Sequence, residues 1–246
     1  DRQALADSLY RGYAPALDTY LPDQHPLLDG AQVSTYPYDP AAGMALLDEL
    51  GWRDEDADGV REAHGVAGIP DGAPLQFTLT TTDAAYRGAL GTLVNAYLDA
   101  CGMDAVLVQA PARDLFAQDP GAALTGRHFD LAQYSFPGSW TPPCQIALAG
   151  AIPSESTFWE GENLSGYANP AYDLACLGAL NALPGTPEYV VGHQEALRLF
   201  SADLPVLPLF AHVHFIMTRS DLVQDAMAYT QGSELIHIET FRLAAP

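Results

Sequence analysis

The stretch from residue 75 to residue 109, LQFTLTTTDAAYRGALGTLVNAYLDACGMDAVLVQ, decides the fold. Residues 75–81 alternate apolar and polar side chains with a period of two, which is typical of a β-strand. Thr82 or Asp83 is positioned to cap a following amphipathic helix, and residues 104–109 form a second apolar run. This strand–helix–strand order predicts two parallel strands joined by a right-handed crossover, and therefore an α/β fold.

The prediction extends to the rest of the chain through capping residues and hydrophobic periodicity. Asp39, followed by Pro40, marks the start of one helix, and Gly51 marks its end. Helices are predicted over residues 1–10, 39–50, 112–117, 119–124, 170–182 and 187–203. Further strands are predicted over residues 128–136, 205–218 and 234–242. This order indicates a mixed sheet flanked by helices, connected by loops rich in proline and glycine.

Charge composition excludes several classes of protein. The 246 residues include 31 Asp and Glu against 10 Lys and Arg, which gives a formal net charge of −21. Such a chain repels phosphate backbones and anionic lipid surfaces, so we expect no nucleic-acid or membrane-surface partner. All of the basic residues are arginine, whereas a P-loop and a Schiff-base mechanism both need a lysine.

Targeting and membrane segments are missing from the sequence. No apolar stretch reaches the length of roughly 18 residues that a transmembrane helix needs, and no signal peptide is found. The sequence nevertheless opens at Asp1 without a methionine, directly in a predicted helix. We interpret the chain as a fragment or a processed product of a longer protein.

An acidic loop at residues 54–62, DEDADGVRE, matches the first half of a calcium-binding loop. It has acids at relative positions 1, 3 and 5 and Gly59 at position 6, so that oxygen ligands gather on one side of a sharp turn. The candidate ligands are Asp54, Asp56, Asp58, the carbonyl of Val60, and Glu62. Gly65 stands where the full loop has a bidentate glutamate. The alternative is a solvated acidic turn without a metal ion.

Aromatic residues cluster between residues 129 and 172, mostly in loops that follow a predicted strand. Ligands bind at this position in open α/β sheets, so the cluster is a candidate for a cleft lining. The same residues could instead fill a small core beneath the large loops.

Support for an enzyme is weak. The nucleophile-elbow, zinc-protease, dinucleotide-binding and C-x-x-C motifs are all absent. Asp130 and Glu160 are the acids that a hydrolase could use. His212 and His214 alternate on a predicted strand, but a metal site needs three or four ligands, so we interpret them as packing or surface residues.

Several segments, taken together and in order, resemble one family. They are DRQALADSLYRGYAPALDTYLP, YPYDPAAGMALLDELGW, DEDADGVRE, PLQFTLTT, GRHFDLAQYSF, NLSGYANPAYDLAC and LPVLPLF. This set is similar to the extracytoplasmic solute-binding proteins of ABC importers, in the peptide/nickel class (family 5). The resemblance implies the α/β fold of a type II periplasmic-binding-protein-like lobe.

The resemblance also implies what kind of protein the chain comes from. The family's full proteins are about twice as long and close two lobes over a solute. Residues 1–218 correspond to the C-terminal lobe, residues 219–246 to a segment returning toward the hinge, and the N-terminal lobe is missing. The implied protein is an extracytoplasmic receptor, optionally lipid-anchored, that delivers a peptide or another small solute to an ABC permease. It needs no cofactor, although a structural calcium ion is an option.

The family places its cleft along the segment that includes GRHFDLAQYSFPGSW. The implied ligand-binding residues are Gln133, Tyr134, Phe136, Ser139 and Trp140. Peptide binders of the family place an aspartate just after an aromatic residue here, where it pairs with the peptide's amino group. Residues 138–141 contain no acid. A buried ammonium group without a partner is costly, which argues against a peptide with a free amino terminus.

Three cysteines complete the set of candidate residues. A disulfide between Cys144 and Cys176 would pin the loop-rich segment between them and suits an oxidising compartment. Cys101, at a helix end, would stay a free thiol, and three unpaired cysteines are the alternative. Solute binding is the leading function, ahead of an extracellular hydrolase domain and a calcium-stabilised structural module.

Overall fold

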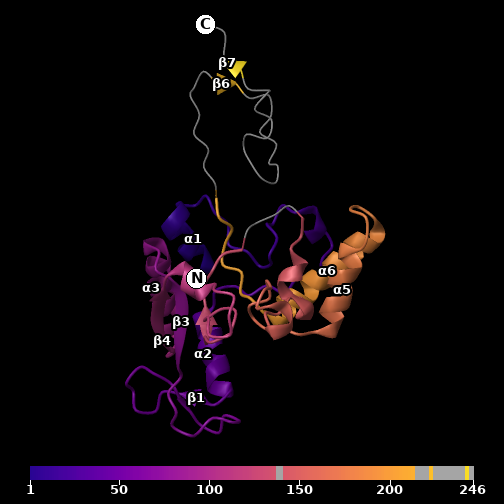
Figure 1. The fold of residues 1–246 in the computed structure, drawn as a ribbon. Coiled ribbons are helices and arrows are strands. Elements are labelled where there is room, and N and C mark those ends of the chain that lie inside the picture. The colour runs from indigo at the N-terminus through magenta and orange to yellow at the C-terminus, as the bar shows by residue number, and fades with distance from the viewer. Residues whose placement is uncertain (137–140, 214–221, 224–241, 244–246) are drawn as a thin grey trace.

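A three-stranded parallel sheet organises the first half of the chain in the computed structural model (Figure 1). Strand β3 (Gln76–Thr82) lies in the centre, between β4 (Asp104–Ala110) and β5 (Leu131–Ala132). Helix α3 (Ala85–Asp99) connects β3 to β4. The parallel strand pair expected from residues 75–109 is confirmed, as is the α/β class.

The structure describes residues 1–136, 141–213, 222–223 and 242–243. The remaining helices are α1 (Arg2–Tyr10), α2 (Pro40–Glu49), α4 (Ala112–Leu115), α5 (Pro170–Leu180) and α6 (Pro187–Asp203), with short 3-10 turns at Pro26–Leu28, Cys144–Ala147, Ala149–Ala151 and Glu155–Thr157. The short strands pair as β1 (Trp52–Arg53) with β2 (Glu62–Ala63), and β6 (Leu222–Val223) with β7 (Arg242–Leu243), both antiparallel. None of the described helices is long and apolar enough to cross a membrane.

Side-chain caps set the start of most helices. The Asp39 carboxylate accepts a hydrogen bond from the Ala42 amide at 2.9 Å, and Asn169 and Thr186 cap α5 and α6 in the same way. A proline follows each of these three caps, where its missing N–H costs nothing. The predicted helices at 39–50, 170–182 and 187–203 are therefore confirmed.

The helical hairpin of α5 and α6 forms a second packing unit beside the sheet (Figure 1). Its core contains Tyr172, Phe200 and the disulfide between Cys144 and Cys176, all essentially inaccessible to solvent. The two cysteines lie 32 positions apart in sequence, with their Cα atoms 5.8 Å apart. The predicted disulfide is thus present, and Cys101 is a free, half-buried thiol.

Several predicted boundaries are wrong for physical reasons. The strand expected at 128–136 shortens to β5, because the Asp130 carboxylate, instead of a strand carbonyl, accepts the hydrogen bond of the Thr78 amide. Helix α3 begins after Ala84 and not after Thr82 or Asp83, since the Asp83 amide still bonds to the Ala110 carbonyl and extends the strand pairing.

Three further expectations also change. Residues 119–124 form turns and no helix. Within residues 205–213, the pairing is limited to a bridge between Ala16 and Phe210, where Pro205 and Pro208 cannot donate to a ladder. The strand expected at 234–242 lies outside the described residues except for Arg242, which belongs to β7.

Candidate functional site

Polar side chains from four distant parts of the chain meet near the carboxyl end of the parallel sheet. His212 links two of them: its Nδ1 lies 2.5 Å from the Tyr10 hydroxyl, and its Nε2 lies 2.7 Å from the Ser135 hydroxyl. Arg87, in the first turn of α3, donates a hydrogen bond to the same Ser135 oxygen. This set, Tyr10, Arg87, Ser135 and His212, is called the edge cluster below.

Local structure explains how the edge cluster assembles. Ser135 follows β5, whose pairing continues through a hydrogen bond from the Gln133 amide to the Thr80 carbonyl at 2.8 Å. Arg87 lies in the first turn of the helix that follows β3, so both residues lie where parallel strands end. In open α/β sheets this carboxyl end is the usual location of a ligand.

Gln133 was predicted to line the cleft, and it lies on the α3 side of the sheet. Only 7% of the residue is exposed, and neither its amide oxygen nor its amide nitrogen has a hydrogen-bond partner among the described residues. A Cβ atom on Gly91 would lie 3.6 Å from the Gln133 Oε1 atom and only 2.6 Å from a methyl group of Leu107. The glycine therefore allows α3 to approach the sheet closely over Gln133.

Tyr134 and Phe136 lie on the opposite side of this segment. Their rings contact each other edge to face, with centroids 5.0 Å apart. Tyr134 packs on the buried cluster formed by Leu115, Leu124 and Leu164, and its burial raises the pKa of its hydroxyl to about 12. Phe136 packs against the disulfide core. Their role as ligand contacts stays a prediction, and Ser139 and Trp140 lie outside the described residues.

The other aromatic residues between positions 129 and 172 divide between core and surface. Tyr172 is completely buried and contacts Tyr167 edge to face, whereas Phe158 is 83% exposed. Tyr172 therefore belongs to the small core beneath the loops, which was the alternative to a cleft lining.

The edge cluster contains residues that the sequence analysis did not assign to the site. Ser135 shares a face with Gln133 because side chains alternate along a strand, so the period-two pattern could have indicated Ser135 as a neighbour of Gln133. Nothing in the sequence around Arg87 and Tyr10 indicated that they belong to the site, since their partners are 48 and 202 positions away along the chain. His212 was expected to be an ordinary packing or surface residue.

The acids proposed for hydrolysis are poorly suited to proton transfer. Asp130 accepts hydrogen bonds at 2.8 Å from both the amide and the hydroxyl of Thr78, which lower the pKa of its carboxyl. It fastens the start of β5 to β3. Glu160 is exposed on a loop and belongs to no cluster of polar groups that the described residues reveal.

The acidic loop brings its four carboxylates together at the other end of the sheet. Ligand oxygens of Asp54, Asp56, Asp58 and Glu62 all lie within 4.8 Å of one another. Each carboxylate also accepts a backbone N–H from the loop; the Gly59 amide, for example, lies 3.1 Å from Asp54 Oδ2. These bonds hold the turn with or without a cation, so calcium at this loop stays a prediction.

The position of the acidic loop separates it from the edge cluster. The Arg61 amide donates to the Gly102 carbonyl at 2.9 Å, which places the loop beside the start of β4. Figure 1 shows β1, at the base of the loop, at one end of the sheet and α1, which carries Tyr10, at the other. The acidic loop and the edge cluster therefore lie at different ends of the sheet.

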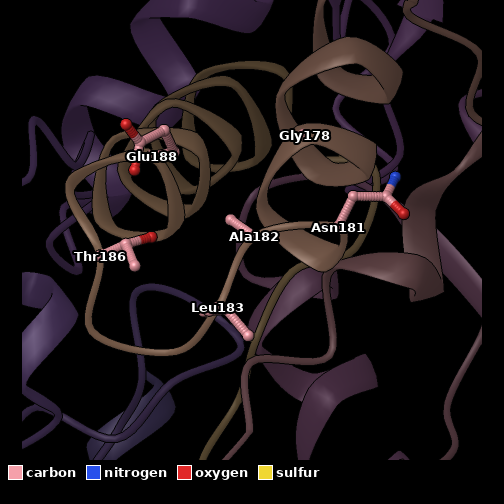
Figure 2. A pocket seen from close by; sticks show the side chains of 6 residues that line it. All are labelled: Gly178, Asn181, Ala182, Leu183, Thr186 and Glu188. Carbon is pink, nitrogen blue, oxygen red and sulfur yellow. The ribbon is translucent and has the colours of Figure 1, made fainter.

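A surface pocket of about 420 Å³ lies where α5 turns into α6 (Figure 2). It is lined by Gly178, Asn181, Ala182, Leu183, Thr186 and Glu188. The sticks in Figure 2 show one carboxylate, from Glu188, and no second ionisable group beside it. None of the residues predicted to bind a solute lines this pocket.

The chain belongs to a known family. The model of the bacterial extracellular solute-binding proteins, family 5 (middle region), matches residues 1–151. No curated protein matches the sequence.

Solved structures of this class share the fold. An oligopeptide-binding protein from Thermus thermophilus, solved with a pentapeptide, has a TM-score of 0.69 and 21% identity over 85% of this chain and 35% of its own. The oligopeptide-binding protein AppA from Bacillus subtilis, with a nonapeptide, has a TM-score of 0.69 and 18% identity over 100% of this chain and 45% of its own. NikZ from Campylobacter jejuni, with Ni(L-His), has a TM-score of 0.67 and 18% identity over 85% of this chain and 39% of its own.

These comparisons confirm the expected family and the type II periplasmic-binding-protein-like fold. The chain spans 35% to 45% of the length of these three structures. At 18% to 21% identity, the likeness identifies a fold and leaves the solute open.

Proposed function

We propose that the chain is the solute-binding lobe of a receptor that serves an ABC importer. The observation that carries this proposal is the family match over residues 1–151, which ends just beyond the edge cluster's Ser135. The solute would bind at the carboxyl edge of the sheet, against the edge cluster, and a second lobe would close over it.

The lobe acts by binding and does no chemistry. The only acids that suggested a hydrolase, Asp130 and Glu160, are a structural clamp and an exposed loop residue. The family consists of extracellular solute-binding proteins. We infer that the full protein works outside the cytoplasm, with or without a lipid anchor, and passes its solute to a permease. A disulfide fits that oxidising setting.

The solute class follows in part from the missing acid. Residues 138–141 offer no carboxylate for the amino group of a peptide. A peptide with a free amino terminus is therefore a poorer candidate than a solute without an ammonium group.

We also propose one structural calcium ion at the acidic loop, bound by Asp54, Asp56, Asp58, Glu62 and the Val60 carbonyl. The convergence of four carboxylates supports it. With Gly65 in place of the bidentate acid, the affinity would be modest, around 10⁻⁴ M.

A thermal-shift screen tests the receptor function. The 246-residue chain, and any longer protein from the same reading frame, is melted with peptides, oligosaccharides, carboxylic acids and metal–histidine chelates. The proposal expects a concentration-dependent rise in the melting temperature with at least one solute, which is recovered unchanged. Consumption of the solute would indicate an enzyme instead. No stabilisation of the longer protein by any class would contradict the receptor function.

A further inference from the structure

Arg87 carries a buried positive charge that has no neighbouring anion among the residues that the structure describes. Two arginines are buried among the described residues, Arg61 and Arg87, and only 7% of Arg87 is exposed. Arg61 pairs with Asp48 at 2.5 Å. In contrast, no carboxylate of the described residues lies within ion-pair distance of Arg87, although the chain has a net charge of −21. A buried charge without a counter-charge is unfavourable, and the described residues supply no group that would balance Arg87.

The guanidinium group retains a donor for such a group. Its Nη2 atom donates to the Ser135 hydroxyl, its Nε atom donates to the Tyr86 hydroxyl at 3.1 Å, and it lies over the Tyr86 ring at 5.0 Å. Nη1 has no hydrogen-bond partner among the described residues, and it is not sealed from solvent as the Gln133 amide is. Ser135 and His212 are both exposed beside it.

The start of α3 adds to the positive potential. Ala84 occupies the capping position of this 15-residue helix, and no side chain accepts a hydrogen bond from its first amides. The first N–H groups of a helix and the positive end of its dipole both favour an anion. Because Arg87 is in the same first turn, its positive charge and the positive end of the helix dipole attract an anion to the same place.

We propose that this edge binds an anionic group of the solute, a carboxylate or a phosphate. Arg87 Nη1 is the charged donor, and Ser135, His212 and the first amides of α3 flank it. This inference rests on the proposed function and adds the charge of the solute. Arg87 favours an anion, while residues 138–141 offer nothing that would neutralise an ammonium group. The proposal therefore favours a solute that has an anionic group and no free ammonium group.

NMR titration of the 246-residue chain tests the site directly. Sodium phosphate and sodium acetate are the probes, and sodium chloride at matched ionic strength is the control for screening. Phosphate or acetate is expected to shift the Arg87 Nε–H resonance and the backbone amides of Ala85 and Tyr86 in a saturable way. Half a cleft should give dissociation constants in the range of about 1 to 10 mM. Saturation by phosphate alone would indicate a phosphorylated solute, and saturation by acetate would indicate a carboxylic acid.

Variants separate Arg87 from the general charge of the chain. Arg87→Gln should weaken anion binding at least tenfold, and Ser135→Ala, at an exposed position, should weaken it about threefold. The matched control, Arg113→Gln, removes the same charge from the surface helix α4 and should leave binding unchanged. Since no described residue supplies Arg87 with an anion, Arg87→Gln should melt at the same temperature as the parent or higher. A purely structural arginine would give a lower melting temperature.

Three results would overturn the inference. These are no saturable shift with either anion, equal losses for Arg87→Gln and Arg113→Gln, or unchanged binding in Ser135→Ala together with an unfolded Arg87→Gln. Maltose and an amidated dipeptide, screened in parallel, distinguish this failure from failure of the receptor function. If either one binds at the edge cluster while the anions do not, the receptor function stands and the anion assignment is wrong.

Discussion

The hydroxyl of Tyr172 donates a hydrogen bond of 2.7 Å to the backbone carbonyl of Cys144, and both residues are completely buried in the core. The helix that carries Tyr172 is therefore attached to the Cys144 turn twice, once by this bond and once by the disulfide to Cys176. The two attachments lie one helical turn apart on α5, so they fix the helix in orientation as well as in position.

The contribution of this hydrogen bond to stability should be measurable by removing the Tyr172 hydroxyl oxygen. Tyr172→Phe leaves the buried Cys144 carbonyl without its donor, which should lower the free energy of unfolding by about 1–3 kcal/mol. Urea denaturation measures this. Tyr167→Phe is the control, because its hydroxyl bonds to Asp203 near the surface and its loss should cost less. Equal losses in the two variants would contradict the argument from burial.

Removal of the disulfide should have a larger effect. Cys144→Ala with Cys176→Ala frees a segment of 32 positions in the unfolded chain, which should cost about 3–4 kcal/mol. Cys101→Ala, which removes only the free thiol, should remain within about 1 kcal/mol of the parent under the same denaturation. Titration of three free thiols in unreduced, denatured protein would show that the bond does not form.

Buried His193 should make the chain sensitive to mild acid. Its ring is fully inaccessible, and burial, with a smaller contribution from neighbouring His25, lowers the pKa of His193 to about 4. In the unfolded chain the pKa would be about 6.5. The contribution of this residue is therefore complete above about pH 6.5 and is lost as the pH falls toward 4, with a slope of up to about 1.4 kcal/mol per pH unit.

Two substitutions separate this titration from packing. His193→Leu and His193→Phe differ in volume, but both remove the ionisable ring. Both should flatten the dependence of the melting temperature on pH between about 6.5 and 4, whatever their effect near neutral pH. A parent chain whose stability is constant over that range would refute the assignment.

Calcium should raise the melting temperature if the acidic loop binds it. The ion would relieve the repulsion between the carboxylates of Asp54, Asp56, Asp58 and Glu62 and supply oxygen contacts. At about 10 mM calcium and an affinity of about 10⁻⁴ M, the gain is about 2.7 kcal/mol, and Asp56→Ala should abolish it. Identical melting curves with calcium and with a chelator, for parent and variant alike, would show that the loop is a solvated turn that binds no calcium.

The 246-residue chain should bind its solute weakly by itself. In the proposed receptor the solute lies between two lobes, so one lobe leaves it largely hydrated. Loss of half the contacts of a micromolar ligand removes roughly 4 kcal/mol, which leaves millimolar affinity. Calorimetry of the chain should therefore show no micromolar binding. A micromolar value would mean that this lobe holds a complete site.

Local patterns predicted the elements that local interactions form. The alternation at residues 75–81 and the capping sequences at Asp39, Asn169 and Thr186 specify their elements within a few positions, so these predictions hold. The helix expected at 119–124 also opens on an aspartate and a proline, yet it is absent. There the Leu124 amide bonds to the Leu115 carbonyl, a contact from outside the segment that no local pattern reveals.

The edge cluster could not be predicted in the same way. It depends on contacts between residues far apart in sequence, such as Ser135 with His212 and Tyr10 with His212. A one-dimensional pattern shows that Ser135 and Gln133 share a face, but not what lies opposite that face. Three cysteines allow three pairings, and the disulfide was predicted correctly because Cys101, at a helix end, was expected to stay free.

Gly91 sets how closely α3 packs on the sheet. A methyl group at position 91 would collide with Leu107 at 2.6 Å, so it would lift α3 away from the sheet. Arg87 lies one turn earlier on the same face of the helix, and its guanidinium would move with that lift. In the proposed anion site, substitutions at position 91 would therefore change how deeply the Arg87 charge lies and, through that depth, the affinity for the anion, although residue 91 itself touches no solute.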